Sequence, residues 1–142
     1  MVTLGRSALI SGVSLLVSQG SDNFYRFRWS QKDASDVVTP VDLTGYTAEA
    51  QMRATVGSAI WVTLTSPDAI QLGADGSITI LLGDEVTSAV EWNDYKTGVW
   101  DIELTSPLGV VTRFAEGTVS VAPDVTRDTV TATVAAVTRR GR

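Results

Sequence analysis

Residues 98–127 place the strongest constraint on the fold, because apolar and polar side chains alternate strictly along residues 100–105 and alternation resumes after a turn. Trp100, Ile102 and Leu104 share one parity, with charged residues between them. Strict alternation is typical of a half-buried β-strand, whose successive side chains leave opposite faces of the sheet. Residues 106–109, Ser-Pro-Leu-Gly, have the composition of a tight turn. The segment is therefore predicted to be a long hairpin with one dry face.

The returning strand of this hairpin changes parity along its length. Val110, Thr112 and Phe114 lie on one parity, whereas Val119 and Val121 lie on the other. One extra residue, a β-bulge, accounts for such a change, and we expect it near Glu116 and Gly117 because glycine tolerates the bend. Pro123 has no N–H to give to a ladder and is expected to end the strand.

Other alternating segments predict an all-β chain. Tyr25, Phe27 and Trp29 share one face and are expected in the core. Further strands are predicted at residues 13–17, 46–52, 70–72 and 78–82. Residues 60–64 are predicted to be the first strand of a hairpin that turns at residues 66–68. Residues 31–39 are expected to form a loop, and Asp84 to cap one short helix over 85–91. So many half-buried strands require a sandwich or a barrel, and we favour an antiparallel β-sandwich.

The chain is expected to divide into three parts. Residues 1–20 form an N-terminal arm and first strand, residues 21–127 the β-sandwich domain, and residues 128–142 a C-terminal extension. In the extension, Val and Ala at even positions alternate mainly with Thr at odd positions. This pattern fits a strand donated to a neighbour's open sheet edge, and it fits equally well an added edge strand of the chain's own sheet.

The net charge of −5 is unevenly distributed. Residues 1–20 carry +1 and residues 128–142 carry +2, which leaves −8 on residues 21–127. An acidic body argues against direct nucleic-acid binding by the domain. Arg139, Arg140 and Arg142 are candidate interaction residues that could reach an acidic neighbour, or they form only a solvated chain end. No stretch has the pattern of a secretory signal or a membrane span, so no membrane partner is expected.

The residue types present limit the chemistry. The chain has no cysteine and no histidine, which excludes Ser-His-Asp and Cys-His catalysis and the usual zinc sites. No catalytic, cofactor or metal site is expected, and a hydrolase built on Asp101 and Glu103 is a weak hypothesis. Trp61 has the opposite parity to its apolar neighbours and is therefore expected to be exposed as a contact residue. Trp92 is expected to plug the core.

Several stretches of the sequence resemble a family of phage proteins. They are residues 23–29, 41–48 (Val-Asp-Leu-Thr-Gly-Tyr-Thr-Ala), 100–105 with Gly109, 116–119 and 125–127. Together they resemble the LtfC-like small β-sandwich virion proteins of tailed bacteriophages, which include tail-collar and minor tail proteins. The resemblance covers roughly residues 23–127. It implies an immunoglobulin-like sandwich, no catalysis and many copies in a ring or lattice, and it identifies no site residues.

These observations lead to one expected function with alternatives. We expect a non-enzymatic structural protein of a tailed-phage virion, a multi-copy minor tail or collar subunit that assembles through its terminal arms. Its partners would be other virion proteins and further copies of itself. A capsid decoration (cement) protein is the first alternative. A carbohydrate-binding module that uses an exposed Trp61 is the second.

Overall fold

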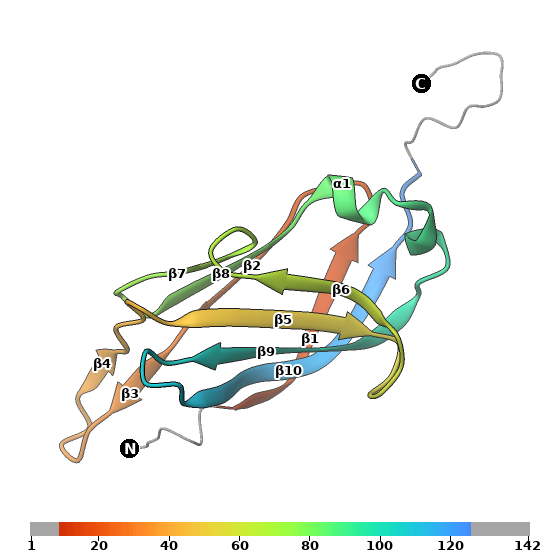
Figure 1. Ribbon diagram of the computed structural model, residues 1–142. Helices are drawn as coiled ribbons and strands as arrows, with labels where there is room; N and C mark the ends of the chain where they lie inside the picture. The colour runs from red at the N-terminus through yellow and green to blue at the C-terminus, as the bar shows by residue number, and fades with distance from the viewer. Residues whose placement is uncertain (1–8, 126–142) are drawn as a thin grey trace, which may run out of the picture.

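Ten strands and two short helical turns make up residues 9–125, the part of the chain that the computed structural model describes (Figure 1). The strands are β1 (Ile10–Ser18), β2 (Asn23–Arg28), β3 (Ser30–Lys32), β4 (Val38–Pro40), β5 (Thr47–Arg53), β6 (Ile60–Thr65), β7 (Ile70–Leu72), β8 (Ser77–Leu82), β9 (Thr97–Thr105) and β10 (Val111–Ala122). The larger sheet has the order β1-β10-β9-β5-β6 and the smaller one β2-β8-β7, while β3 and β4 pair only with each other. The chain is an all-β, immunoglobulin-like sandwich, as predicted.

The hairpin of β9 and β10 forms the centre of the larger sheet. Trp100, Ile102 and Leu104 are buried on its inner face, at most 3% exposed, in agreement with the alternation. Gly109 adopts a φ of +86° in the turn, and its N–H donates to the carbonyl of Ser106 at 2.8 Å. The strand β10 ends at Ala122, directly before Pro123 as expected.

The β-bulge of β10 lies at Phe114, earlier than the position near Gly117 that the sequence suggested. The pairing with β9 shifts between Arg113 and Ala115, and Phe114 and Ala115 are both buried. Two consecutive core residues require the extra residue at that point. Gly117 has another function, because a Cβ there would collide with the carbonyl oxygen of Val13 in β1. The glycine lets β1 approach β10 closely.

The first strand, β1, is an edge of the larger sheet. It pairs with β10 in parallel, with Leu15 opposite Val119 and Val17 opposite Val121, whereas the other pairs of this sheet are antiparallel. Leu15 and Val17 are buried and Leu16 is 58% exposed. Part of the predicted segment 1–20 thus belongs to the sandwich. The predicted extension, residues 128–142, lies outside the described residues.

The core between the sheets contains aromatic side chains from β2, from the residue after it, and from β9 and β10. Phe27 stacks on Trp100 with ring centroids 5.9 Å apart and meets Phe114 edge-on at 6.1 Å. Trp29 packs against Phe114 at 5.8 Å. Burying a side chain of this size contributes about 1.5–3 kcal/mol to folding. The prediction that Tyr25, Phe27 and Trp29 face inward is confirmed.

Residues 31–39 form most of the hairpin of β3 and β4, so the prediction of a loop is wrong. The Oδ1 atom of Asp33 accepts the N–H groups of Ser35 and Val37, and Asp36 adopts a φ of 63°. The side chain of Asp33 thereby closes the turn that joins the two strands. Because residues 31–39 are mostly polar, their composition does not predict that they pair as strands.

The predicted turn at residues 66–68 does not join a hairpin. The strand β6 pairs with β5 in the larger sheet, whereas β7 pairs with β8 in the smaller one. Residues 66–69 therefore cross from one sheet to the other. The turn of residues 73–76, between β7 and β8, does join a hairpin, and Gly76 adopts a φ of +83° there.

The predicted helix is two separate turns, α1 (Asp84–Thr87) and a 3-10 turn η2 (Val90–Asn93). Asp84 is not the cap, because the N-cap residue is Gly83 and makes no side-chain hydrogen bond. Instead, Oδ1 of Asp22 accepts the N–H of Asp84 at 2.9 Å. None of the helical segments in residues 9–125 is long and apolar enough to cross a membrane.

Candidate functional site

Trp61, the candidate contact residue in the described part of the chain, is partly exposed, less than its parity suggested. The pairing of β5 with β6 shifts between Met52, opposite Val62, and Arg53, opposite Ile60. Trp61 lies at this irregularity, so simple alternation does not predict which face of the sheet its side chain occupies. Its ring packs over Gly98, where a Cβ atom would collide with the indole.

Trp61 belongs to an aromatic cluster that also contains Trp92 and Tyr95. The ring of Trp61 stacks on Tyr95 with a centroid distance of 4.4 Å and an interplanar angle of 6°. Trp92 meets both rings edge-on and is 3% exposed, so it covers the core as predicted. One face of the Trp61 ring is therefore occupied by the protein itself.

Within residues 9–125, the strand that carries Trp61, β6, pairs with β5 alone and forms an edge of the larger sheet (Figure 1). The N–H of Ser66 donates to the carbonyl of Ala48 at 3.0 Å. Because hydrogen-bonded pairs alternate along an antiparallel ladder, the bonded pairs continue at Leu64 and Val62. The N–H and C=O of Thr63 and the N–H of Thr65 therefore point away from β5. We call this row of backbone groups the β6 edge.

Apart from the pairing irregularity beside Trp61, β6 carries none of the usual protections of a sheet edge within residues 9–125. The sequence of β6, Ile-Trp-Val-Thr-Leu-Thr, has no charged residue and no proline. The side chains of Ile60, Thr63 and Thr65 are exposed. Natural edge strands are commonly protected by charge, proline or shortness, because an unprotected edge pairs with other strands. The strand β6 is six residues long, so it is a site where a further strand can add.

The opposite edge of the same sheet, at β1, is closed by side chains of β2. Asn23 accepts the N–H of Ser18 with its Oδ1 at 2.9 Å and donates from Nδ2 to the Ser18 carbonyl at 3.1 Å. The hydroxyl of Tyr25 donates to the carbonyl of Leu16 at 2.6 Å. Burial raises the pKa of Tyr25 to about 12, so its hydroxyl keeps its proton at neutral pH. We call this the β1 edge.

An apolar groove of about 710 Å³ lies at the end of the sandwich that carries the β9–β10 turn. Its apolar lining includes Leu9, Trp29, Val41, Tyr46, Leu108 and Val110. Leu108 and Val110 are 92% and 60% exposed. Leu9, the first described residue, is part of this lining.

The segment Asp-Leu-Thr-Gly-Tyr, which carries part of the family resemblance, is a turn at the entry to β5. Asp42 accepts the N–H and the hydroxyl of Thr44, at 2.9 and 2.6 Å, and these bonds hold the pKa of Asp42 below its ordinary value. Leu43 is buried, and Gly45 has a φ of +83°. The motif therefore has a structural role here.

The carboxylates of Asp101 and Glu103 lie on the outer face of β9, as predicted. The carboxylate of Asp101 is 3.8 Å from Nε of Arg113 and keeps 40% side-chain exposure. Exposed ion pairs of this kind contribute less than about 1 kcal/mol. Glu103 is exposed, so neither carboxyl group has the desolvated surroundings that a general acid requires.

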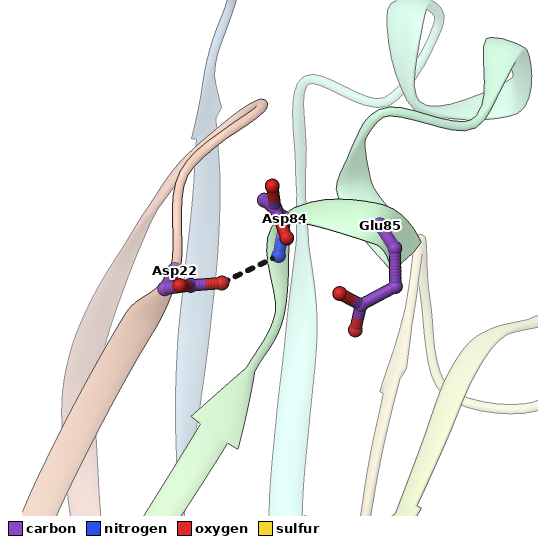
Figure 2. A group of neighbouring side chains, drawn as sticks. All are labelled: Asp22, Asp84 and Glu85. Carbon is purple, nitrogen blue, oxygen red and sulfur yellow. Dashed lines mark hydrogen bonds between the residues drawn. The ribbon is translucent and has the colours of Figure 1, made fainter.

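A second group of carboxylates lies at the start of α1, where Figure 2 shows Asp22, Asp84 and Glu85. One oxygen atom of each lies within 4.8 Å of the others, and all three residues are exposed. The hydrogen bond from the Asp84 N–H to Asp22 gives the group a structural role at the first helical turn. Three exposed carboxylates alone do not define a cation site.

The remaining candidate residues, Arg139, Arg140 and Arg142, lie outside the described residues. Sequence reasoning missed the β6 edge, although one signal was present, since residues 60–65 contain no charge and no proline. It also missed the closure of the β1 edge, because the roles of Asn23 and Tyr25 depend on how β2 lies beside β1.

Comparisons with known proteins leave the chain without an assigned family. No family model matches it, and no curated protein matches it. Among solved structures, the chain is similar to extracellular domains 3–5 of Drosophila OTK, with 9% sequence identity and a TM-score of 0.33. The match covers 76% of this chain and 32% of that one, so the chain spans about a third of that structure's length. A similarity this low says nothing about function.

Proposed function

We propose that the chain is a non-enzymatic structural subunit of a tailed-phage virion, present in several copies at the tail or neck. The observation that carries the proposal is that the first and last strands begin and end at opposite ends of an acidic sandwich, while the terminal segments of the sequence are basic. Because β1 and β10 run parallel, the start of β1 and the end of β10 lie at opposite ends of the sandwich (Figure 1). Residues 1–20 and 128–142 carry +1 and +2, and the residues between them −8.

This arrangement suits subunits that contact one another head to tail. A basic extension from one copy is attracted to the acidic body of the next, and such attraction guides association and favours the correct orientation. The β6 edge and the apolar groove offer surfaces for these contacts. The resemblance of residues 23–127 to LtfC-like proteins suggests the virion as the place of assembly.

The residue chemistry supports a role without catalysis. The chain lacks histidine and cysteine, and Asp101 and Glu103 lie on the wet face of the larger sheet. A carbohydrate-binding module would require a freely accessible aromatic ring. The stacking of Trp61 on Tyr95 weighs against that alternative.

Mass spectrometry of particles purified from the encoding phage tests the proposal. We expect the protein in every particle preparation, at on the order of a dozen copies if it forms a ring at the tail or neck. A count of hundreds, relative to the major capsid protein, would instead support the capsid decoration role. Absence of the protein from purified particles would contradict both.

A further inference from the structure

We infer that the β6 edge accepts residues 129–136 from a second copy of this chain as an added strand. The inference rests on the proposed structural function and specifies the contact that joins two copies. Each subunit donates its C-terminal segment to one neighbour and accepts, at β6, the segment of another.

The β6 edge has the geometry that an incoming strand requires. Thr63 presents both its N–H and its C=O away from β5, and Thr65 presents its N–H two residues further along. The side chains of both residues are exposed, so the approach to these groups is open. Main-chain hydrogen bonds supply the affinity in strand addition, and side-chain fit supplies the specificity.

The sequence of residues 129–136, Thr-Val-Thr-Ala-Thr-Val-Ala-Ala, suits the donor role. It is uncharged and lacks proline and glycine, and its Val and Ala side chains fall on one parity except for Ala135. Eight extended residues span about 26 Å, which is longer than the six residues of β6 require. Arg139, Arg140 and Arg142 follow the donor segment and meet the −8 body of the acceptor.

The β1 edge is the wrong acceptor for this segment, although it lies closest. β1 is next to β10, from whose end the C-terminal residues depart. Near that end Asn23 already holds both backbone groups of Ser18, and Tyr25 holds the Leu16 carbonyl. An added strand would have to displace these three hydrogen bonds.

The chain's own β6 is also disfavoured as the acceptor. The strands β9 and β5 lie between β10 and β6, a separation of about 14 Å at the usual strand spacing. The direct path crosses the end of the sheet, where Trp61, Trp92 and Tyr95 pack together. A second copy can approach the β6 edge from outside without crossing this cluster.

A pair of complementary variants tests the inference. The acceptor-only chain lacks residues 126–142, and the donor-only chain is full length with Thr63→Pro, which removes the outward N–H without removing a bond to β5. The full-length unsubstituted chain is expected to form concentration-dependent oligomers in analytical ultracentrifugation. Each variant alone is expected to be monomeric, and their equimolar mixture to form a dimer that does not grow further.

A conservative variant serves as the control for Thr63→Pro. Thr63→Val keeps the backbone N–H and a β-branched side chain, so its self-association should stay within about twofold of the unsubstituted chain. Thr63→Pro should weaken association about tenfold or more. Far-UV circular dichroism and thermal unfolding confirm that each variant is folded before it is mixed.

The remaining outcomes overturn the inference. A monomeric unsubstituted chain, an acceptor-only chain that still oligomerises, or a mixture that stays monomeric would each show that residues 126–142 do not join copies at β6. The proposed function is tested by a separate experiment, the detection of the protein in purified particles. A chain found in particles that fails the mixing test would keep the structural function and lose this contact.

Discussion

The two edges of the five-stranded sheet differ in how their outward backbone groups are satisfied. At the β1 edge, Asn23 and Tyr25 bind the outward groups of Ser18 and Leu16. At the β6 edge, the outward groups of Thr63 have no such partner among the strands of the sheet. An edge is therefore closed by specific side chains beside it, and the difference indicates which edge is available to another chain.

The largest expected effect on stability comes from Gly117→Ala, which separates β1 from β10. The new Cβ would collide with the Val13 carbonyl, which also accepts the indole N–H of Trp100 at 2.9 Å. We expect the free energy of unfolding in urea to fall by about 3 kcal/mol. Ser14→Ala, which removes only an exposed hydroxyl contact to Thr118, should change it by less than about 0.5 kcal/mol. Equal effects of the two substitutions would contradict the close packing of β1.

Removal of the cap on the β1 edge should have the next largest effect. Asn23 is 9% exposed and bonds three backbone groups, the N–H and C=O of Ser18 and the C=O of Ser21. We expect Asn23→Ala to lower the free energy of unfolding by about 2 kcal/mol, because these groups lose their partner. The variant should also aggregate faster than the unsubstituted chain in light scattering. An unchanged aggregation rate would show that Asn23 does not protect this edge.

Tyr25→Phe should weaken the β1 edge by a smaller amount. It removes the hydrogen bond to Leu16, and we expect a loss of about 1 kcal/mol in urea unfolding at pH 7. The raised pKa, about 12 against the ordinary value of 10.0, means that the folded state holds this proton more strongly than the unfolded chain. The stabilisation from Tyr25 is therefore complete below pH 10 and is lost as the pH rises to 12.

The contribution of the Tyr25 hydroxyl to the pH dependence of stability is obtained by comparing two chains. The free energy of unfolding is measured between pH 9 and pH 12 for the Tyr25→Phe chain and for the unsubstituted one. The unsubstituted chain should lose more stability over the interval from 10 to 12. Parallel curves would show that this hydroxyl is not held by the β1 edge.

The smallest effect on stability is expected at the β6 edge. Thr63→Lys adds a charge of the kind that protects natural edge strands, and we expect the free energy of unfolding to change by less than about 0.5 kcal/mol. Self-association measured by sedimentation should nevertheless fall clearly. If Thr63→Lys associates as strongly as the unsubstituted chain, the β6 edge is not the contact.

Much of the fold could be predicted because the alternation of apolar and polar residues along a strand shows which side chains are buried. The inner positions of β2 and β9 followed from parity. Trp61 was misplaced because the β5–β6 pairing shifts at that point, and a one-residue irregularity reverses the parity rule. The bulge at Phe114 was misplaced by the same kind of ambiguity.

The candidate site could be predicted far less well. Which strand is an edge depends on the order β1-β10-β9-β5-β6, and the pairing of β1 with β10 joins residues about a hundred positions apart. No local pattern specifies such a contact. The hydrogen bonds of Asn23 and Tyr25 to β1 follow from that order, so the closed edge became visible only in the structure.

Amide hydrogen exchange, measured by NMR on the chain without residues 126–142, tests the difference between the two edges most directly. We expect the Thr63 amide to exchange near its intrinsic rate, and the Ser18 amide, bound by Asn23, to be protected about a hundredfold or more. Addition of a peptide with the sequence of residues 126–142 should then slow exchange at Thr63 and leave Ser18 unchanged. Equal protection of the two amides before the peptide is added, or no change at Thr63 afterwards, would contradict the account.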